Sequence, residues 1–342
     1  MARIPFIAVR LRLESEDDII ARLRAVAERR RRRTPEGEDD EPPYRDLVQQ
    51  ARDILARRHK RSGLSHLRKE DAARLVVLKH GVDLVELPNP HAADTIAAAI
   101  QDEMPWMAPA TELVWHALRR AALERAPIRI PPLLLVGPPG IGKSFWARRL
   151  AGHLRVPEMA VEATSENAGF GITGLQAGWG SARTGRLLEL ILQHRIANPV
   201  VFVDEIEKAG SAVSTSGRSF DLASALLPLL ERETARAWTC PYFRVGFDMS
   251  WISWILAANG LSGLPEPLLS RCHVVRLPPL TAADLRAFAS REAARRGLSE
   301  ASTEAITATL TAAGPRAGAL SLRTVLRMLE RAEVMEQLHR VH

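Results

Sequence analysis

The feature that most restricts the fold of this chain is a glycine-rich stretch, GPPGIGKS, at residues 137–144. Four apolar residues precede it, and the helical pattern KSFWARRLAGHL begins at its Lys143. Glycines allow the backbone to curl so that several N–H groups point at phosphate oxygens, and the helix adds its positive N-terminal end. A strand, such a loop and a helix in this order favour an α/β fold with a mainly parallel sheet.

The loop matches the pattern G-x-x-x-x-G-K-S, whose residue types bind the phosphates of a nucleotide together with a metal ion. Lys143 is expected to reach the terminal phosphates, and the hydroxyl of Ser144 to ligate magnesium. The alternative is a glycine-rich turn that binds nothing. It is disfavoured because glycine, lysine and serine all occupy the positions of the motif, between a strand and a helix. We therefore predict ATP and Mg²⁺ as cofactors, with these loop residues at the phosphates: Gly137, Pro138, Pro139, Gly140, Ile141, Gly142, Lys143 and Ser144.

A second apolar run ends in acids, in the stretch VVFVDEIEK at residues 200–208. The run is typical of a buried parallel strand, and carboxylates at its end are costly unless a positive charge meets them. Asp204 is suited to hold the magnesium, and Glu205 to orient and polarise an attacking water. Acids that merely decorate a helix N-terminus are the alternative. We expect Glu207 and Lys208 to be solvated helix residues.

The pattern of expected helices and strands changes twice along the chain, which predicts three regions. Residues 1–100 are charged and helical in pattern, with a run of five arginines ending at Arg33 and a Pro/Gly/acidic linker near 34–43. Residues 101–278 alternate strands and helices, which defines an α/β domain. Residues 279–342 contain only helical patterns, the first opening with the capping-box pair Thr281 and Asp284.

Composition excludes several classes of protein. The chain has 342 residues, of which 46% are hydrophobic and 25% charged, which is ordinary for a globular protein. Its two cysteines lack the spacing of a zinc site or disulfide scaffold, and no apolar run approaches the length of a membrane span. The N-terminus does not have the pattern of a signal peptide, so we expect a cytoplasmic protein. The net charge of +7 permits a nucleic-acid partner without requiring one.

Several longer strings occur in order and at familiar spacing between about residues 110 and 335. Besides the glycine-rich loop they are GWGSARTGR (178–186), NPVVFVDEIEK (198–208), YFRVGFDMSWISWILAAN (242–259) and LPEPLLSRCHVVRLPP (264–279). Together they resemble the ATPase module of the Lon proteases, within the AAA+ ATPases. The resemblance implies a doubly wound parallel sheet of strand order 5-1-4-3-2, a C-terminal helical lid, and ATP held between them at a subunit interface.

The resemblance also implies roles for individual residues. Asn259, at a strand end, corresponds to the first sensor of the γ-phosphate, although it could simply form a turn. Arg271 corresponds to the arginine finger donated to a neighbouring subunit, and Arg323 to the second sensor, although either could be a surface residue. Trp179 and Gly180 correspond to an aromatic pore loop that grips substrate, although tryptophan is usually buried.

The leading hypothesis is an Mg²⁺-dependent ATP hydrolase that remodels or unfolds protein substrates as a homo-oligomeric ring of six subunits. Because the sequence ends with the lid, we expect no peptidase activity from this chain; a separate peptidase or an adaptor is a candidate partner. The arginine run keeps open an ATPase that remodels or loads nucleic acid. A nucleotide-gated scaffold with negligible turnover is the non-enzymatic alternative.

Overall fold

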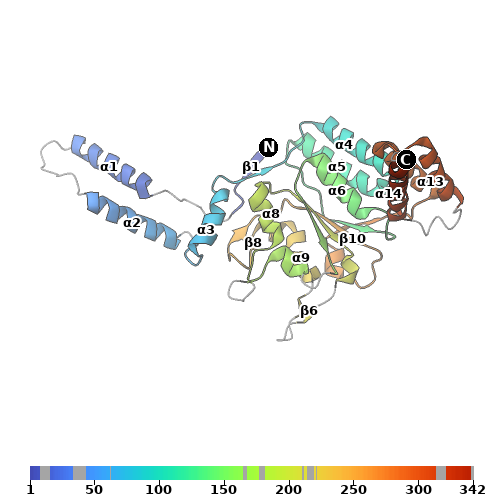
Figure 1. Ribbon diagram of the computed structural model, residues 1–342. Helices are drawn as coiled ribbons and strands as arrows, with labels where there is room; N and C mark the ends of the chain where they lie inside the picture. Colours follow the sequence, from blue (N-terminus) through green and yellow to red (C-terminus); the bar gives the residue numbers. More distant parts are fainter. Residues whose placement is uncertain are drawn as a thin grey trace.

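The computed structural model describes residues 1–7, 16–33, 44–61, 63–164, 168–176, 182–209, 212–213, 219–220, 222–312 and 321–339. A twisted sheet with helices on both faces forms the main body, a helical lid lies at one end, and a helical hairpin projects from the other (Figure 1). The predicted linker at 34–43 lies outside the described residues.

The central sheet has five parallel strands. They are β3 (Leu133–Val136), β4 (Glu158–Glu162), β5 (Val200–Asp204), β10 (Ser253–Ala258) and β11 (His273–Arg276). Their order across the sheet is β11-β3-β10-β5-β4, and every neighbouring pair is parallel. Numbered along the chain, this is the order 5-1-4-3-2, so the predicted topology is confirmed.

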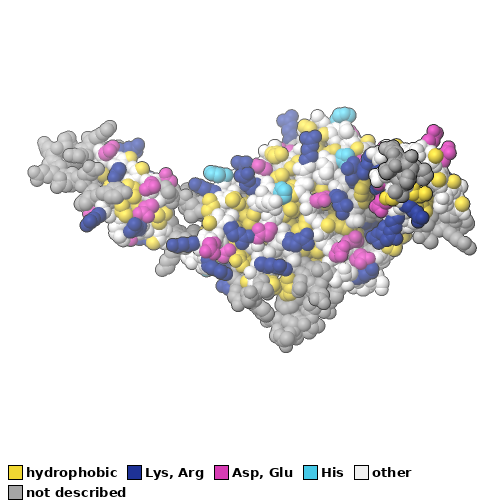
Figure 2. All heavy atoms as spheres, in the orientation of Figure 1, with side chains coloured by type: hydrophobic (Ala, Val, Ile, Leu, Met, Phe, Trp, Pro, Cys, Tyr) yellow, Lys and Arg dark blue, Asp and Glu magenta, His cyan; other side chains and the backbone are white. Residues whose placement is uncertain are grey.

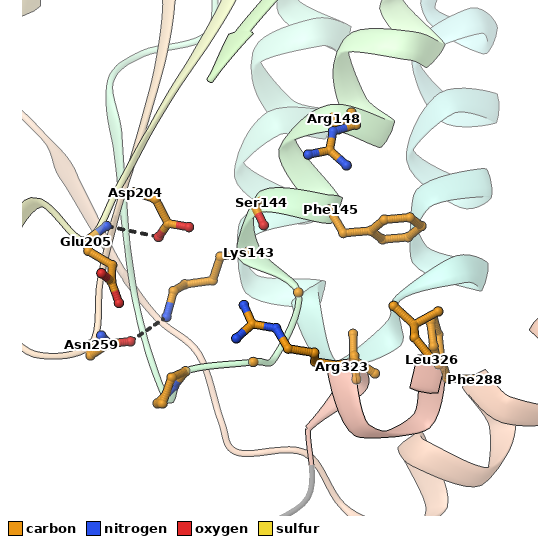
Figure 3. Close-up of a pocket in the computed structure, with 14 residues that line it drawn as sticks. Lys143, Ser144, Phe145, Arg148, Asp204, Glu205, Asn259, Phe288, Arg323 and Leu326 are labelled. Atoms are coloured by element: carbon orange, nitrogen blue, oxygen red, sulfur yellow. Dashed lines mark hydrogen bonds between the residues drawn. The ribbon is translucent and has the colours of Figure 1, made fainter. Parts of the chain in front are cut away.

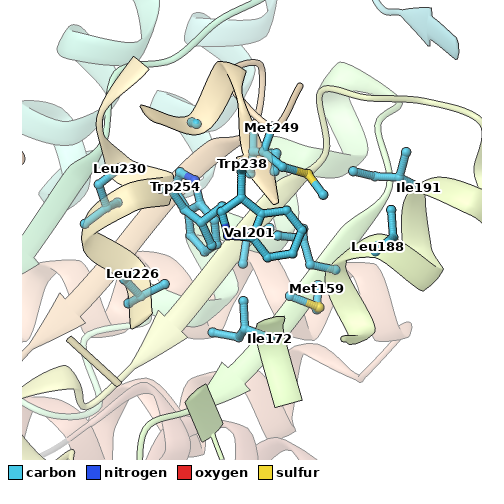
Figure 4. Packing of buried hydrophobic residues seen from close by; sticks show 14 of the residues in the cluster. Met159, Ile172, Leu188, Ile191, Val201, Leu226, Leu230, Trp238, Met249 and Trp254 are labelled. Carbon is cyan, nitrogen blue, oxygen red and sulfur yellow. The ribbon is translucent and has the colours of Figure 1, made fainter. Parts of the chain in front are cut away.

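Alternate residues of the buried strands enter two separate cores, one on each face of the sheet. Leu133 and Leu135 of β3 face one core, whereas Leu134 and Val136 face the other. The first core is completed by α4 (Pro90–Glu103), α5 (Ala108–Glu124) and α6 (Lys143–Leu154). The second is completed by α8 (Arg186–His194) and α9 (Leu222–Leu230), which pack around Trp238 and Trp254 (Figure 4). Burial on both faces explains why the three inner strands, β3, β5 and β10, are apolar without alternation.

The lid consists of α12 (Ala282–Arg296), α13 (Glu300–Ala312) and α14 (Leu322–His339). The predicted capping box is present, because the Asp284 N–H donates to Thr281 Oγ1 at 3.1 Å and the Thr281 N–H donates to Asp284 Oδ2 at 2.9 Å. The helix ends at Gly297, whose φ of 70° is left-handed. Phe288 and Val325 are buried in the same core as α6, the helix that follows the glycine-rich loop, so the lid packs directly on that face of the sheet.

The N-terminal region contains the helices that its pattern predicts, α1 (Glu16–Arg33), α2 (Tyr44–Arg61) and α3 (Lys69–Leu75). It also contains two strands that the sequence pattern does not predict, β1 (Ala2–Ile4) and β2 (Val82–Leu84), which pair antiparallel. Each strand has only three residues, too few for a periodic pattern. The predicted domain boundary at residue 100 falls inside α4, and the division into domains stays a prediction.

The start of the chain is part of the main core. Phe6 is completely buried, with its ring centroid 5.6 Å from that of Phe247, and its carbonyl accepts the Asp248 N–H at 2.9 Å. Residues 64–84, which follow the hairpin, contribute Leu64, Leu75 and Leu84 to the same core. The α1–α2 hairpin is therefore an excursion between two segments that are both anchored in the main body.

Replacing Phe6 with alanine is expected to lower the free energy of unfolding by about 3–5 kcal/mol, because it leaves a cavity in a closed apolar core. Urea unfolding at equilibrium measures this loss. Arg3→Ala serves as the control, since Arg3 lies in the same segment and forms an exposed ion pair with Asp83. Equal effects of the two substitutions would contradict the anchoring role of Phe6.

The remaining elements are short. They are η1 (Val76–Leu78), η2 (Pro105–Met107), α7 (Ala168–Thr173), η3 (Ile206–Lys208), β6 (Ala212–Val213), β7 (Ser219–Phe220), α10 (Arg232–Arg236), β8 (Trp238–Thr239), β9 (Gly246–Phe247) and α11 (Glu266–Leu269). Within the part of the chain that the structure describes, none of the helices has the length and apolar character needed to cross a membrane.

Candidate active site

The glycine-rich loop connects β3 to α6 and is closed from outside by the lid. Gly140 and Gly142 have φ angles of 77° and 93°, a left-handed conformation that glycine adopts without strain. A β-carbon on Gly140 would lie 2.5 Å from Cβ of Ser321, and the Leu322 N–H donates to the Gly140 carbonyl at 3.0 Å. The first residues of the lid helix α14 thus contact the loop, so a change in the position of the lid would alter these contacts directly.

Lys143 lies inside this loop. Its Nζ donates to the carbonyl oxygens of Gly137 at 2.7 Å and Pro138 at 3.1 Å, and to Oδ1 of Asn259 at 3.2 Å (Figure 3). Only 7% of the residue is exposed. Burial lowers the pKa of Lys143, and the nearby carboxylates, Asp204 foremost, oppose that shift. The ammonium group is therefore pre-positioned in a largely buried place at the edge of the loop, where an incoming phosphate would meet a strong charge-assisted donor.

The two predicted acids lie at the carboxyl end of β5. The Glu205 N–H donates to Asp204 Oδ1 at 2.9 Å, and Glu205 has a φ of 53°, a left-handed conformation that is uncommon outside glycine. Burial raises the pKa of Asp204, while the Glu205 N–H and Lys143 act in the opposite direction. The Glu205 carboxylate accepts from Lys208 Nζ at 2.6 Å and is otherwise part-exposed. A strained residue at a strand end is typical of a functional site.

These elements surround one cavity of about 330 Å³ between the sheet and the lid (Figure 3). The predicted residues that line it are Pro139, Gly140, Gly142, Lys143, Ser144, Asp204, Glu205, Asn259 and Arg323. Ile141 is buried in the core beneath the loop, and its carbonyl accepts the indole N–H of Trp106 at 2.9 Å.

The other end of the cavity is apolar and was not predicted. Phe145 of α6, Phe288 of α12 and Leu326 of α14 line it (Figure 3). Only Phe145 is near the loop in the sequence, so no local pattern marks the other two. The cavity therefore offers a charged end suited to phosphates and an apolar end suited to a flat, weakly polar group.

The oxygens expected to bind magnesium fit that ion. Ser144 is the second residue of α6, and the Asp204 carboxylate points toward that helix across the cavity (Figure 3). Mg²⁺ prefers oxygen ligands and commonly keeps several waters, with one or two protein ligands besides the phosphates of its substrate. No group of three or more His, Cys, Asp or Glu suited to a metal occurs among the described residues. Ser144 and Asp204, which both line the cavity, offer two oxygens of this kind.

Glu207 was predicted to be a solvated helix residue, and this prediction is wrong. Its Oε1 accepts the backbone N–H of Asn259 at 3.0 Å and the side-chain Nδ2 of Asn259 at 2.8 Å. Its Oε2 is buried and has no hydrogen-bond partner among the described residues. The reason is that residues 206–208 form a single 3₁₀ turn, which directs Glu207 back toward the end of β10. Lys208 is half-exposed, as expected.

Arg271 does not line the cavity. It precedes β11, whose first residue His273 pairs with Leu133 at the opposite end of β3 from the glycine-rich loop. The four paired residues of β3 span roughly 13 Å, so β11 begins about that far along the sheet from the loop, and Arg271 precedes this start. Its Nη2 is paired with Glu231 Oε2 at 3.0 Å, its Nη1 donates to the Pro267 carbonyl at 2.9 Å, and 32% of the side chain is exposed.

The predicted pore-loop residues Trp179 and Gly180 lie outside the described residues. The segments on either side are paired, since Gly174 and Thr184 form an antiparallel bridge and the Leu175 N–H donates to the Arg183 carbonyl at 2.9 Å. Arg74 of α3 donates to Thr184 Oγ1 at 3.3 Å, which connects the N-terminal region to this stem.

The order of the parallel strands and the loop beneath the lid are those of an AAA+ domain with a phosphate-binding loop. Residues 133–280 match the family model described as "ATPase family associated with various cellular activities (AAA)", so the chain carries an AAA domain. This family assignment implies nucleotide binding and ATP hydrolysis.

Within that class, the nucleotide-binding part of the chain is similar to Lon proteases. It is 34% identical over 153 residues to the peroxisomal Lon protease homolog 2 of Zea mays, which covers 45% of this chain and 17% of that protein. It is 36% identical over 147 residues to the Lon protease of Chlamydia trachomatis, covering 42% of this chain and 17% of that protein. The chain thus spans less than a fifth of the length of these relatives.

Among solved structures, the chain is similar to a Saccharomyces cerevisiae Hsp104:casein complex in an extended conformation. The TM-score is 0.59 at 16% sequence identity, covering 96% of this chain and 65% of that chain. At this identity the likeness concerns the fold.

Proposed function

We propose that this protein is an Mg²⁺-dependent AAA+ ATPase that uses ATP hydrolysis to remodel or unfold protein substrates, assembled as a homo-oligomeric ring of six in the cytoplasm. The observation that carries the ATPase assignment is the convergence of Lys143, Asp204 and Glu205 on one cavity beneath the lid. A protein substrate is supported by the similarity to Lon proteases and by a fold shared with Hsp104, which was solved with casein.

In the proposed mechanism, the backbone of the loop and Lys143 hold the phosphates, while Ser144 and Asp204 hold the metal ion. Glu205, whose carboxylate faces the cavity from the strand end, orients and polarises the attacking water. Asn259 contacts the same region from the neighbouring strand. Arg323, on the lid helix that rests on the loop, adds positive charge at the terminal phosphate (Figure 3). When bound by Ser144 and Asp204, magnesium would supply positive charge that offsets the charge developing on the transferred phosphoryl group.

The apolar end of the cavity fits the base of the nucleotide. Phe145 and Phe288 offer aromatic surface there, and Leu326 closes the pocket from the lid. Since base and phosphates would contact both the main domain and the lid, ATP binding would favour one lid position over others.

A ring is supported by the place of Arg271. An arginine at the far end of the sheet from its own loop is of no use to its own nucleotide. Its side chain is about one-third exposed and would leave Glu231 to reach a neighbour. In a ring with this arrangement each active site is completed by the next subunit. Trp179 and Gly180 are proposed to line the central pore and to grip the substrate polypeptide.

Replacing Lys143 with alanine tests the nucleotide site. The affinity for Mg·ATP is expected to fall roughly 10- to 150-fold, since a hydrogen bond to a charged group contributes about 1.5–3 kcal/mol. Calorimetric titration of the nucleotide measures the change, and a melting curve shows whether the variant is folded. Lys79→Ala, a substitution of an exposed lysine remote from the cavity, is the control. Unchanged affinity of a folded Lys143→Ala protein would refute the proposed function.

A further inference from the structure

Asn259 is held from two sides by groups of opposite hydrogen-bonding character. On one side, Oε1 of Glu207 accepts both the backbone N–H and the side-chain Nδ2 of Asn259, at 3.0 and 2.8 Å. On the other side, Oδ1 of Asn259 accepts from Nζ of Lys143 at 3.2 Å. The three side chains form a chain of hydrogen bonds from η3 through the end of β10 to the phosphate-binding loop.

This arrangement leaves the amide of Asn259 one orientation. An ionised carboxylate can only accept hydrogen bonds, and an ammonium group can only donate them. With the amide turned over, its oxygen would face the Glu207 carboxylate and its NH₂ group would face the Lys143 ammonium. Both contacts would then be repulsive, in a partly buried setting where unpaired polar groups are costly.

We propose that Glu207 is a positioning residue that fixes the Asn259 amide with its oxygen toward Lys143 and the cavity; this proposal rests on the ATPase function proposed above. Glu207 does not line the cavity and acts through Asn259. Its effect is to present an acceptor, rather than a freely rotating amide, to the water that would lie between Lys143 and Glu205. The buried second oxygen, Oε2, adds negative charge beside Lys143, in keeping with the influence of Glu207 on that residue.

A double-mutant cycle in turnover tests the proposal. Glu207→Ala is expected to lower kcat for phosphate release about 10- to 100-fold, as misplacement of a catalytic group does. The Kd for ATP should change by less than about threefold, because the phosphate-binding loop is intact. Asn259→Ala should lower kcat at least as much, and the double variant should be no slower than Asn259→Ala alone. Glu207→Gln, whose amide oxygen can still accept both N–H groups, should recover most of the activity.

Three results would overturn the proposal. One is multiplication of the two effects in the double variant, which would mean that Glu207 acts independently of Asn259. Another is wild-type kcat in folded Glu207→Ala. The third is an equal loss of kcat in Glu207→Gln and Glu207→Ala. The control is Glu233→Ala, at an exposed acid on α10, which should leave kcat and Kd unchanged.

A second measurement, on nucleotide-free protein, follows the contact without reference to turnover. Asn259→Asp places a carboxylate against Glu207, so the melting temperature should fall by several degrees. Adding Glu207→Gln supplies an amide donor to that carboxylate, so the melting temperature should rise again toward the wild-type value. Absence of this rescue would show that the two side chains are not partners, even if Glu207→Ala fails to fold. Wild-type protein that binds but does not hydrolyse ATP would refute the proposed function, while the melting data would still report the contact.

Discussion

Replacing Arg271 with alanine is expected to lower ATP turnover by about 10³–10⁵-fold, the contribution of an arginine finger in phosphoryl transfer. ATP binding by the isolated subunit should be nearly unchanged, because Arg271 lies at the opposite end of the sheet from the phosphate-binding loop. Phosphate release and calorimetric titration measure the two quantities separately. Assembly should also persist, as judged by sedimentation, since one exposed side chain is removed.

The decisive form of this experiment mixes two inactive variants. Subunits that carry Glu205→Gln still donate Arg271, and subunits that carry Arg271→Ala still hold Glu205. Mixed rings would therefore contain some complete active sites, and turnover should reappear on mixing. Arg232→Ala, at an exposed arginine close to Arg271 in space through Glu231, is the matched control and should remain active. No recovery in mixtures that demonstrably co-assemble would argue against a finger acting between subunits.

Glu205→Gln is expected to lower turnover by about 10²–10⁴-fold, the usual contribution of a positioned general base. Binding of Mg·ATP should survive, because the substitution keeps the shape of the side chain and leaves Lys143, Ser144 and Asp204 in place. The measurements are phosphate release and the Kd for ATP. Glu233→Gln, the same chemical change at an exposed site on α10, is the control. Full turnover by the folded Glu205→Gln protein would sink the assignment of Glu205 as the base.

The sheet could be predicted because its information is local and redundant. Strands β3, β5 and β10 are apolar runs, and β4 shows the alternating exposure of an edge strand. The resemblance to Lon ATPase modules supplied the strand order, which local patterns do not contain. The lid helix α12 was equally accessible, since Thr281, Asp284 and Gly297 mark its two ends by their side-chain chemistry. Strands β1 and β2 were missed because a three-residue strand is specified by its partner rather than by its own sequence.

The residues of the candidate site could be predicted only where they belong to one sequence motif. The loop residues, Asp204 and Glu205 each stand in a recognisable order with neighbours of the required type. Glu207 is two residues from Glu205, yet its role depends on a 3₁₀ turn that brings it to Asn259, more than fifty positions away. Phe288 and Leu326 reach the cavity only because the lid folds over it. The position of such residues at the site depends on tertiary packing, which the periodicity and spacing of residues in the sequence do not reveal.

Because the first residues of the chain pack in the main core, removing the arginine run by truncation from the N-terminus would also remove part of that core. A shortened protein that begins after Arg33 would lack the nucleic-acid candidate and Phe6 together, so any defect would have two causes. Deleting residues within the hairpin and joining the start of α1 to the end of α2 would keep β1 and Phe6. A chain shortened in this way separates what the projecting helices do from what keeps the main body folded.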